Sequence, residues 1–175
     1  MRAYSTMQSL RTLVRHDIME VVEVNVYYDT GFEDAFPQEW LRRVAETVLA
    51  AENQPDAELG IVLTGQSKIH ELNKRYLERD RPTDVLAFAL KGTPGEMPFP
   101  APDDDVDHLG EVVISVEQAA IQAKKHRHSV SREVAILLVH GVLHLVGYDH
   151  GEPEEERAMD AKARGILRKI PRMTP

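Results

Sequence analysis

Three histidines within eleven residues constrain this chain more than any other feature of its sequence. His140, His144 and His150 lie in the segment HGVLHLVGYDH, which spans residues 140–150. A helix places residues four positions apart on one face, so His140 and His144 would present their imidazoles together. Gly147 follows where a left-handed residue commonly ends a helix, which would let the chain turn back and bring His150 to the pair. This arrangement predicts a site in which three imidazoles hold one zinc ion.

The residue after the first histidine separates this site from that of a metalloprotease. The histidine and glycine spacing is that of the metzincin proteases, which carry a glutamate as general base directly after the first histidine. Here that position is Gly141, and we expect the missing side chain to leave room for a substrate. Three neutral imidazoles and an open coordination position favour an anionic substrate such as a phosphodiester. Asp149, beside the last histidine, either orients a ligand histidine or caps the turn after the helix.

Composition limits the kind of protein and the kind of metal site. The chain has 175 residues, which is enough for one domain with its own core. It contains no cysteine, so nitrogen and oxygen must hold any metal, and a reducing cytosol poses no problem. No apolar run is long enough to span a membrane, and the first residues lack a hydrophobic signal core. We therefore expect a soluble, cytoplasmic protein without a membrane partner.

The charge of the chain bears on nucleic-acid binding. A net charge of −8 argues against binding over the whole surface, although a local basic patch is compatible with that average. The side chains of the main basic segment, residues 124–132, would either bind phosphates or be solvated cations at a helix end. Arg132 lies roughly 12 Å from His140 along a helix, so we expect a basic rim rather than contact with the metal. The main basic segment comprises Lys124, Lys125, His126, Arg127, His128 and Arg132.

Hydrophobic periodicity predicts a single α+β domain over residues 20–171, with a roughly four-stranded mixed sheet covered by about five helices. Strands are predicted at 21–27, 59–64, 84–90 and 111–115. Helices are predicted at 37–52, 67–76, 115–126, 154–169 and from Ser129 or Ser131 to about residue 145. The helix that ends near residue 145 is apolar around most of its circumference, which predicts a central, buried helix.

Two segments fall outside this pattern. Residues 92–107 are rich in Gly, Pro and Asp, a composition that predicts an exposed loop. Residues 1–19 lack regular patterning, and we expect a disordered extension there. A weak transit signal and a start codon assigned too early are the alternatives for the same residues.

The chain resembles the YbeY family of endoribonucleases over roughly residues 20–170. The resemblance rests on HGVLHLVGYDH, on LNKRYLERDRPTDVLAF at 72–88 and on HLGEVVIS at 108–115. It implies a zinc-dependent endoribonuclease specific for single strands, which acts in small-subunit ribosomal RNA maturation and ribosome quality control. It also implies that His140, His144 and His150 bind one Zn²⁺. The expected partners are single-stranded RNA, ribosomal RNA or the small ribosomal subunit, and no DNA is expected.

One position departs from that family. Many of its members carry an arginine after the tyrosine of the L-N-x-x-Y segment, whereas Leu77 follows Tyr76 here. Arg75 or Arg79 could supply the missing phosphate contact, or both could be solvated charges around a helix end. Catalytic power or substrate choice could therefore differ from that of relatives with the arginine. The segment 82–84, Pro-Thr-Asp, is expected to be mainly structural.

Two other classes of function stay open at this point. A metalloprotease or another zinc hydrolase would keep the metal but would need a general base from outside the motif. A noncatalytic, ribosome-associated module would use the zinc structurally, which requires a fourth protein ligand. His108 is available for that role but is far away in the sequence. Three histidines favour Zn²⁺, although Ni²⁺ or another borderline metal would accept the same ligands.

Overall fold

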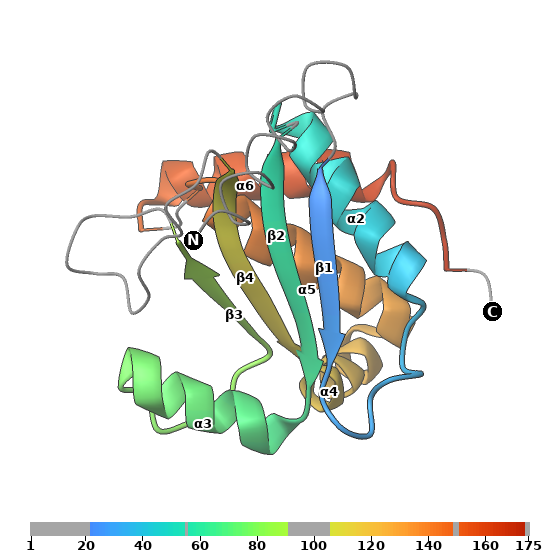
Figure 1. The fold of residues 1–175 in the computed structure, drawn as a ribbon, viewed down its shortest axis with the longest axis vertical. Coiled ribbons are helices and arrows are strands. Elements are labelled where there is room, and N and C mark those ends of the chain that lie inside the picture. The colour runs from blue at the N-terminus through green and yellow to red at the C-terminus, as the bar shows by residue number, and fades with distance from the viewer. Residues whose placement is uncertain (1–21, 55, 91–105, 149–150, 174–175) are drawn as a thin grey trace, which may run out of the picture.

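The structure, a computed structural model, describes residues 22–54, 56–90, 106–148 and 151–173. Within these ranges the chain forms one four-stranded sheet and five helices (Figure 1). The predicted α+β class with a mixed sheet is therefore confirmed. The predicted extension at 1–19, most of the predicted loop at 92–107, and both Asp149 and His150 lie outside the described residues.

The sheet consists of three parallel strands and one antiparallel edge strand. Its order is β1-β2-β4-β3, with β1 parallel to β2, β2 parallel to β4, and β3 antiparallel to β4. This arrangement explains the near-continuous apolar character of β2, because helices cover a sheet that contains parallel strands. The strands are β1 (Glu23–Tyr28), β2 (Ala57–Thr64), β3 (Val85–Ala89) and β4 (Asp107–Ser115).

Strand β4 begins four residues before its predicted start at Glu111. Asp107 and His108 have low intrinsic preference for strands, but both pair with β2 in the parallel register. The register shifts next to Gly110, whose φ is +127°. A Cβ at that position would lie 2.0 Å from the carbonyl oxygen of Phe88 in β3. Only glycine fits this close approach, so the irregularity lets β4 continue through residues that would otherwise be a loop.

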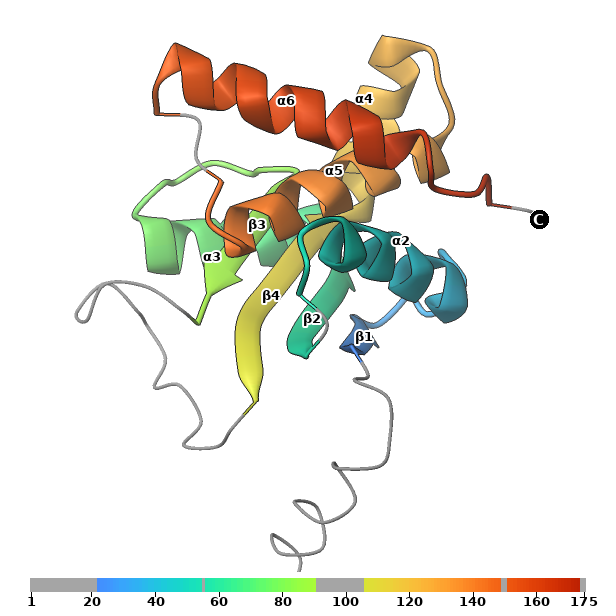
Figure 2. The ribbon, with the colours of Figure 1, turned by 90° about the horizontal axis from the view of Figure 1, so that it is seen from above.

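Most of the helices lie in two layers on one face of the sheet. They are α2 (Gln38–Ala51), α3 (Gln66–Leu77), α4 (Val116–His126), α5 (Val130–Leu145) and α6 (Pro153–Leu167). Figure 2 shows α5 between the sheet and α6, with α2 beside it. Helix α3 covers an end of the opposite face, where Ile69 packs with Leu86 and Val113. None of the helices in the described part of the chain is long and apolar enough to cross a membrane.

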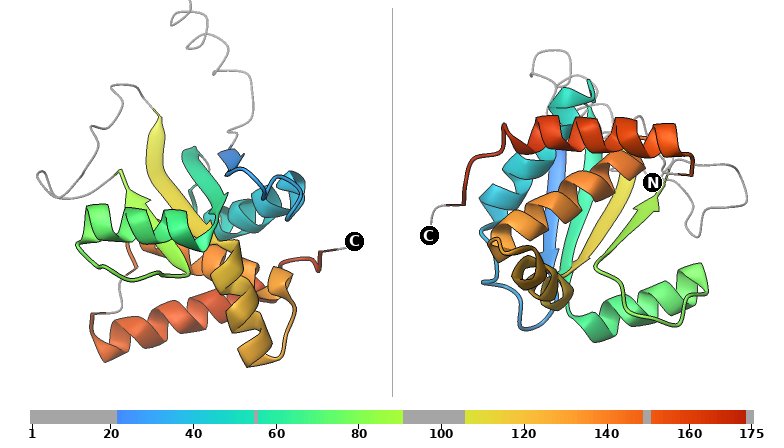
Figure 3. Two further views of the ribbon diagram at one scale, coloured as in Figure 1. Left: turned by 90° about the horizontal axis from the view of Figure 1, so that it is seen from below. Right: turned by 180° about the vertical axis from the view of Figure 1, so that it is seen from behind.

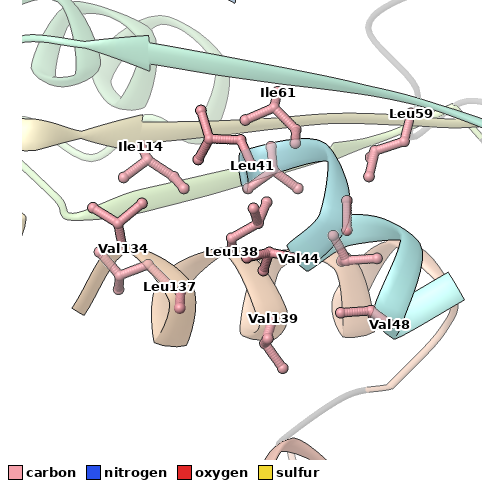
Figure 4. Close-up of a cluster of buried hydrophobic side chains, with 14 of the residues drawn as sticks. Leu41, Val44, Val48, Leu59, Ile61, Ile114, Val134, Leu137, Leu138 and Val139 are labelled. Carbon is pink, nitrogen blue, oxygen red and sulfur yellow. The ribbon is translucent and has the colours of Figure 1, made fainter. Parts of the chain in front are cut away.

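Helix α5 lies at the centre of the main core, as its apolar circumference predicts. Its side chains meet those of α2 and of the inner strands in one buried cluster (Figure 4). The labelled members are Leu41, Val44, Val48, Leu59, Ile61, Ile114, Val134, Leu137, Leu138 and Val139. Burial of this cluster fixes the rotation of α5 about its axis, and therefore the direction in which its polar residues point.

Gly141 is a packing position in this core. A Cβ there would lie 2.6 Å from Cγ1 of Val112 in β4, which is closer than real carbon atoms approach. The absent side chain lets α5 lie directly on β4. The expectation that it leaves room for a substrate is therefore wrong, because Val112 already occupies that space.

Candidate metal centre and cleft

The helix that carries the histidines begins and ends with identifiable caps. Ser129 is the N-terminal cap, since its Oγ accepts a hydrogen bond from the Arg132 amide at 3.1 Å. At the other end Gly147 has φ +103° and donates to the His144 carbonyl, while the Tyr148 amide donates to the Leu143 carbonyl. This pair of bonds is a Schellman motif. The predicted left-handed end of the helix at Gly147 is therefore confirmed.

His140 and His144 lie one turn apart on α5, on the side that faces β3. Their ring centroids are 4.9 Å apart and the rings meet edge to face at 74°. Both side chains are half-buried and line the same cleft. The structure thus brings together the two described members of the predicted zinc site, whereas the third, His150, follows in the segment that is not described.

The His144 ring is oriented by the turn that ends its helix. Its Nδ1 lies 2.9 Å from the Tyr148 carbonyl oxygen. A carbonyl only accepts hydrogen bonds, so Nδ1 carries the hydrogen and Nε2 keeps the lone pair of the neutral ring. Histidines that bind metals are commonly held by such a bond from the other ring nitrogen. The site residues therefore fit an imidazole-bound cation.

Tyr148 is itself anchored to two other helices. Its hydroxyl donates to Glu52 Oε2 at 3.0 Å, and the Lys162 Nζ lies 2.7 Å from Glu52 Oε1. Burial, and then the hydrogen bond to Glu52, raise the pKa of Tyr148, while Glu52 raises the pKa of Lys162. The phenol therefore stays neutral and the ammonium stays charged. This network joins the end of α2, the end of α5 and the middle of α6, and it holds the carbonyl that orients His144.

A cleft of about 760 Å³ runs between α5, β3 and the segment that follows α3. The right-hand view in Figure 3 places these elements side by side, with β3 beside α5 and α3 below. The cleft is lined by Asn73, Leu77, Arg79, Arg81, Pro82, Thr83, Asp84, Val85, Leu86, Ala87, Gln122, Glu133, Ile136, Leu137, His140, Gly141 and His144. Its floor is apolar, while histidines, arginines and carboxylates surround the floor, as expected for a site that binds a polar ligand.

Asp84 forms part of the cleft wall. Its Oδ1 accepts from the Val85 amide at 2.9 Å and from Thr83 Oγ1 at 3.1 Å, and its Oδ2 accepts from Gln122 Nε2 at 2.8 Å. A carboxylate held by so many donors ties β3 to α4. Thr83 and Asp84 therefore border the cleft and at the same time have the structural role that the sequence predicts.

Of the two arginines predicted as candidates for the phosphate contact, only Arg79 is among the residues that line the cleft. Arg79 lines the cleft next to Leu77, which is 46% exposed. Arg75 instead lies over the ring of Tyr76, with its guanidinium carbon 5.4 Å from the ring centroid, and is not among the lining residues. Arg81 lines the cleft as well. The sequence prediction missed Arg81 because its position in a turn shows no periodicity.

The turn that carries these arginines is tied to α3. Asn73 is buried. Its backbone carbonyl accepts a hydrogen bond from the Arg79 amide at 3.2 Å, and its side-chain Nδ2 donates to the Arg81 carbonyl at 2.7 Å. Asp80, between the two arginines, contacts Lys74 and His70, and hydrogen bonds from these two lower the pKa of Asp80. The backbone of the turn is therefore held in place, while both guanidinium groups are exposed.

The basic segment before α5 divides into three groups. Lys124, Lys125 and Arg127 are exposed at the end of α4, where they can form the predicted basic rim. Arg132 instead donates from Nη1 to the Leu167 carbonyl of α6 at 3.4 Å. His126 and His128, the remaining histidines of this segment, lie next to the carboxylate of Glu133.

Glu133 is a further polar residue of the cleft that the sequence prediction missed. It is only 3% exposed, yet it lines the cleft on the same side of α5 as His140, two turns away. The sequence signal that could have identified it is a glutamate two helical turns before His140, in a helix that is otherwise apolar. His108, the residue considered as a fourth metal ligand, pairs through Nδ1 with Glu58 Oε2 at 2.9 Å and does not line the cleft.

Comparison with known proteins relates this arrangement to one family. The family model for "Endoribonuclease YbeY" matches residues 27–171. A protein of that name from Dehalococcoides mccartyi is 46% identical over 144 residues, covering 79% of this chain and 90% of the relative. Another from Geobacillus kaustophilus is 42% identical over 147 residues, covering 83% of this chain and 94% of the relative.

The fold has a counterpart among solved structures. The solution structure of TM1509 from Thermotoga maritima matches with a TM-score of 0.55 and 23% sequence identity, covering 84% of this chain and 88% of that one. At this identity the match concerns the arrangement of the sheet and helices.

Proposed function

This chain belongs to the YbeY endoribonuclease family, and we propose that it cleaves single-stranded RNA in the cleft beside α5. The observation that carries the proposal is the placement of His140 and His144 in the same cleft as Arg79 and Arg81. Two imidazoles that can bind a cation therefore share a cleft with two exposed guanidinium groups that can hold phosphates. RNA hydrolysis needs both functions.

We propose Zn²⁺ as the metal, held by His140, His144 and His150. The oriented ring of His144 supports an imidazole-bound cation, and the lack of cysteine restricts the ligands to nitrogen and oxygen. When bound there, a dication supplies positive charge that stabilises the phosphate as negative charge develops on it. Asp149 follows Tyr148 directly in the sequence. The role we propose for it is to orient a ligand histidine through a hydrogen bond.

The protein residues around this site position the RNA. Arg79 and Arg81 bind phosphates of the strand, which compensates for Leu77 at the position where many relatives carry arginine. Lys124 and Lys125, which are exposed at the end of α4, add positive charge outside the cleft lining. Ribosomal RNA of the small subunit is the proposed natural substrate, on the basis of the family resemblance. The absence of cysteine supports a reducing compartment, the cytoplasm.

The core packing opposes the alternative of a metalloprotease. A protease would need a general base from outside the motif, because position 141 is glycine and even a Cβ there would lie 2.6 Å from Cγ1 of Val112. A structural zinc module is opposed by the open cleft next to the histidines, since a closed site needs a fourth protein ligand. The geometry therefore supports hydrolysis of an anionic substrate best.

The test is an RNA cleavage assay on the zinc-loaded full-length protein. We expect the wild type to cleave a single-stranded RNA and to leave a duplex of the same sequence intact, and His144→Ala to lose at least about 100-fold in rate. His108→Asn, which removes a histidine on β4 outside the cleft, is the matched control and should cleave at the wild-type rate. Intact single-stranded RNA after incubation with zinc-loaded wild type would overturn the proposal, as would full activity of His144→Ala.

A further inference from the structure

A second group of metal-binding side chains lies at the junction of α4 and α5. His126 ends α4, His128 follows Arg127, and Glu133 lies in the first turn of α5. The ligand atoms of these three residues lie within 4.8 Å of one another. The two imidazole rings face the same carboxylate with their centroids 5.7 Å apart. The group is separate from His140, which lies two turns further along α5.

The carboxylate of this group is buried without a suitable partner. Glu133 is 3% exposed, and its Oε2 has no hydrogen-bond partner. Two ring nitrogens are close to that oxygen, His128 Nε2 at 3.0 Å and His126 Nδ1 at 3.6 Å, but neither approaches along the direction of a hydrogen bond. A buried carboxylate oxygen that lacks a donor is costly, so its retention calls for a compensating positive charge.

The tautomer of His128 indicates a cation rather than a neutral contact. Its Nδ1 lies 3.1 Å from the Ser129 carbonyl oxygen, so Nδ1 carries the hydrogen. In the neutral ring the lone pair of Nε2 then faces the carboxylate oxygen at 3.0 Å. Two acceptors at this distance repel each other unless a positive charge, either a second proton on the ring or a metal ion, lies between or beside them. His128 is therefore held by the same kind of bond as His144, whose Nδ1 donates to the Tyr148 carbonyl.

The distances also suit a metal ion. Bonds of about 2.1 Å at tetrahedral angles place neighbouring ligand atoms about 3.4 Å apart. The two nitrogen-to-oxygen distances, 3.0 and 3.6 Å, lie on either side of this value. Two imidazoles and one carboxylate form a common ligand set for Zn²⁺ and similar divalent ions. Because Glu133 lines the cleft, a fourth position would be open to solvent there.

We propose that His126, His128 and Glu133 form a second binding site for a divalent transition-metal ion, separate from the site at His140 and His144. The ion neutralises the buried carboxylate and links the end of α4 to the start of α5. The proposal does not depend on the proposed RNA cleavage, because it rests on ligand geometry alone. Its readout is therefore the number of bound ions.

The experiment counts ions on the full-length protein. The chain is stripped of metal with a chelator and titrated with Zn²⁺ by calorimetry, and bound zinc is counted by elemental analysis after gel filtration. We expect two ions per wild-type chain, and one in a variant that combines His126→Asn and His128→Asn. A variant that combines His140→Ala and His144→Ala should also keep one ion, so failure of either site is seen separately. His108→Asn, which removes a histidine outside both sites, is the matched control and should keep two.

Circular dichroism identifies variants that do not fold. If the double variant at the junction is unfolded, the single variant His126→Asn replaces it, because this half-exposed side chain contributes little to the core. That variant should weaken binding at the second site by about tenfold or more. The proposal is overturned if folded His126→Asn, alone or combined with His128→Asn, binds zinc with the stoichiometry and affinity of wild type.

Discussion

At the scale of single residues, the ring orientation of two histidines depends on a nearby backbone carbonyl. Tyr148 orients His144, and Ser129 orients His128, each by accepting a hydrogen bond from Nδ1. Both carbonyls lie within or next to a helix cap, so the local backbone decides which ring nitrogen keeps its lone pair. The residue type indicates a potential ligand, but this hydrogen bond determines which atom can bind.

Gly141 is the residue at which packing and chemistry meet, and its replacement tests the packing. We expect Gly141→Ala to lower the free energy of unfolding by about 1–3 kcal/mol, because the new Cβ would press against Val112. Urea unfolding followed by circular dichroism measures this change. In a background of Val112→Ala the same substitution should cost clearly less, since the obstructing methyl groups are gone.

A second glycine in a helix is the control for this prediction. Gly165 in α6 has open space where a Cβ would be placed. Gly165→Ala should therefore stabilise the protein by about 0.5–1 kcal/mol through the higher helix propensity of alanine. If Gly141→Ala were also neutral or stabilising, the close contact between α5 and β4 would not exist as described.

At the scale of elements, the short connection between α4 and α5 determines where three functional side chains meet. Arg127 has φ +59°, and the amides of Arg127 and His128 donate to the carbonyls of Lys124 and Ala123. This is the Schellman arrangement with an arginine at the position that usually holds glycine. The left-handed residue reverses the chain so that His126 and His128 both face Glu133 of the next helix.

The arginine in this position predicts a stabilising substitution. A left-handed conformation costs an ordinary residue about 1 kcal/mol, so Arg127→Gly should raise the free energy of unfolding by up to about 1 kcal/mol. Lys125→Gly, two residues earlier and inside the helix with ordinary helical geometry, is the control and should lower the free energy of unfolding by a similar amount. Thermal and urea unfolding measure both. Equal destabilisation by the two glycines would contradict the left-handed geometry at residue 127.

At the scale of the whole molecule, the proposed function requires an acidic protein to bind an acidic substrate through a few local cations. The chain carries a net charge of −8, yet the cleft has two exposed arginines on a turn that Asn73 and Asp80 hold in place. The exposed lysines at the end of α4 lie outside the cleft lining. Binding should therefore be weak at high salt and should depend on a small number of contacts.

Salt dependence tests the contribution of these arginines. We expect Arg79→Ala and Arg81→Ala each to weaken binding to a single-stranded RNA oligomer, and to reduce the slope of log K against log salt by about 0.7. Fluorescence anisotropy in the presence of a chelator measures binding without cleavage. Arg164→Ala on α6, outside the cleft, should bind with the wild-type slope. An unchanged slope in both cleft variants would remove these arginines from the RNA path.

Local signals in the sequence predicted much of this architecture. Periodicity located the helices and strands to within a few residues, except at the start of β4, and the caps at Ser115, Ser129 and Gly147 could be expected from residue type alone. Such features arise from contacts between residues a few positions apart. The histidine pair on α5 belongs to this class, because a single helical turn brings the two rings together.

The sequence by itself determined the helix that carries the histidines, its buried character and the family to which the chain belongs. Only the tertiary structure decided that Val112 fills the space beside Gly141, that Arg81 rather than Arg75 joins Arg79 in the cleft, and that Glu133 meets two histidines of the preceding helix. The physical reason is the range of the interactions. Local hydrogen bonds and periodicity depend on near neighbours, whereas packing and the meeting of charges depend on how the elements are placed against one another in three dimensions.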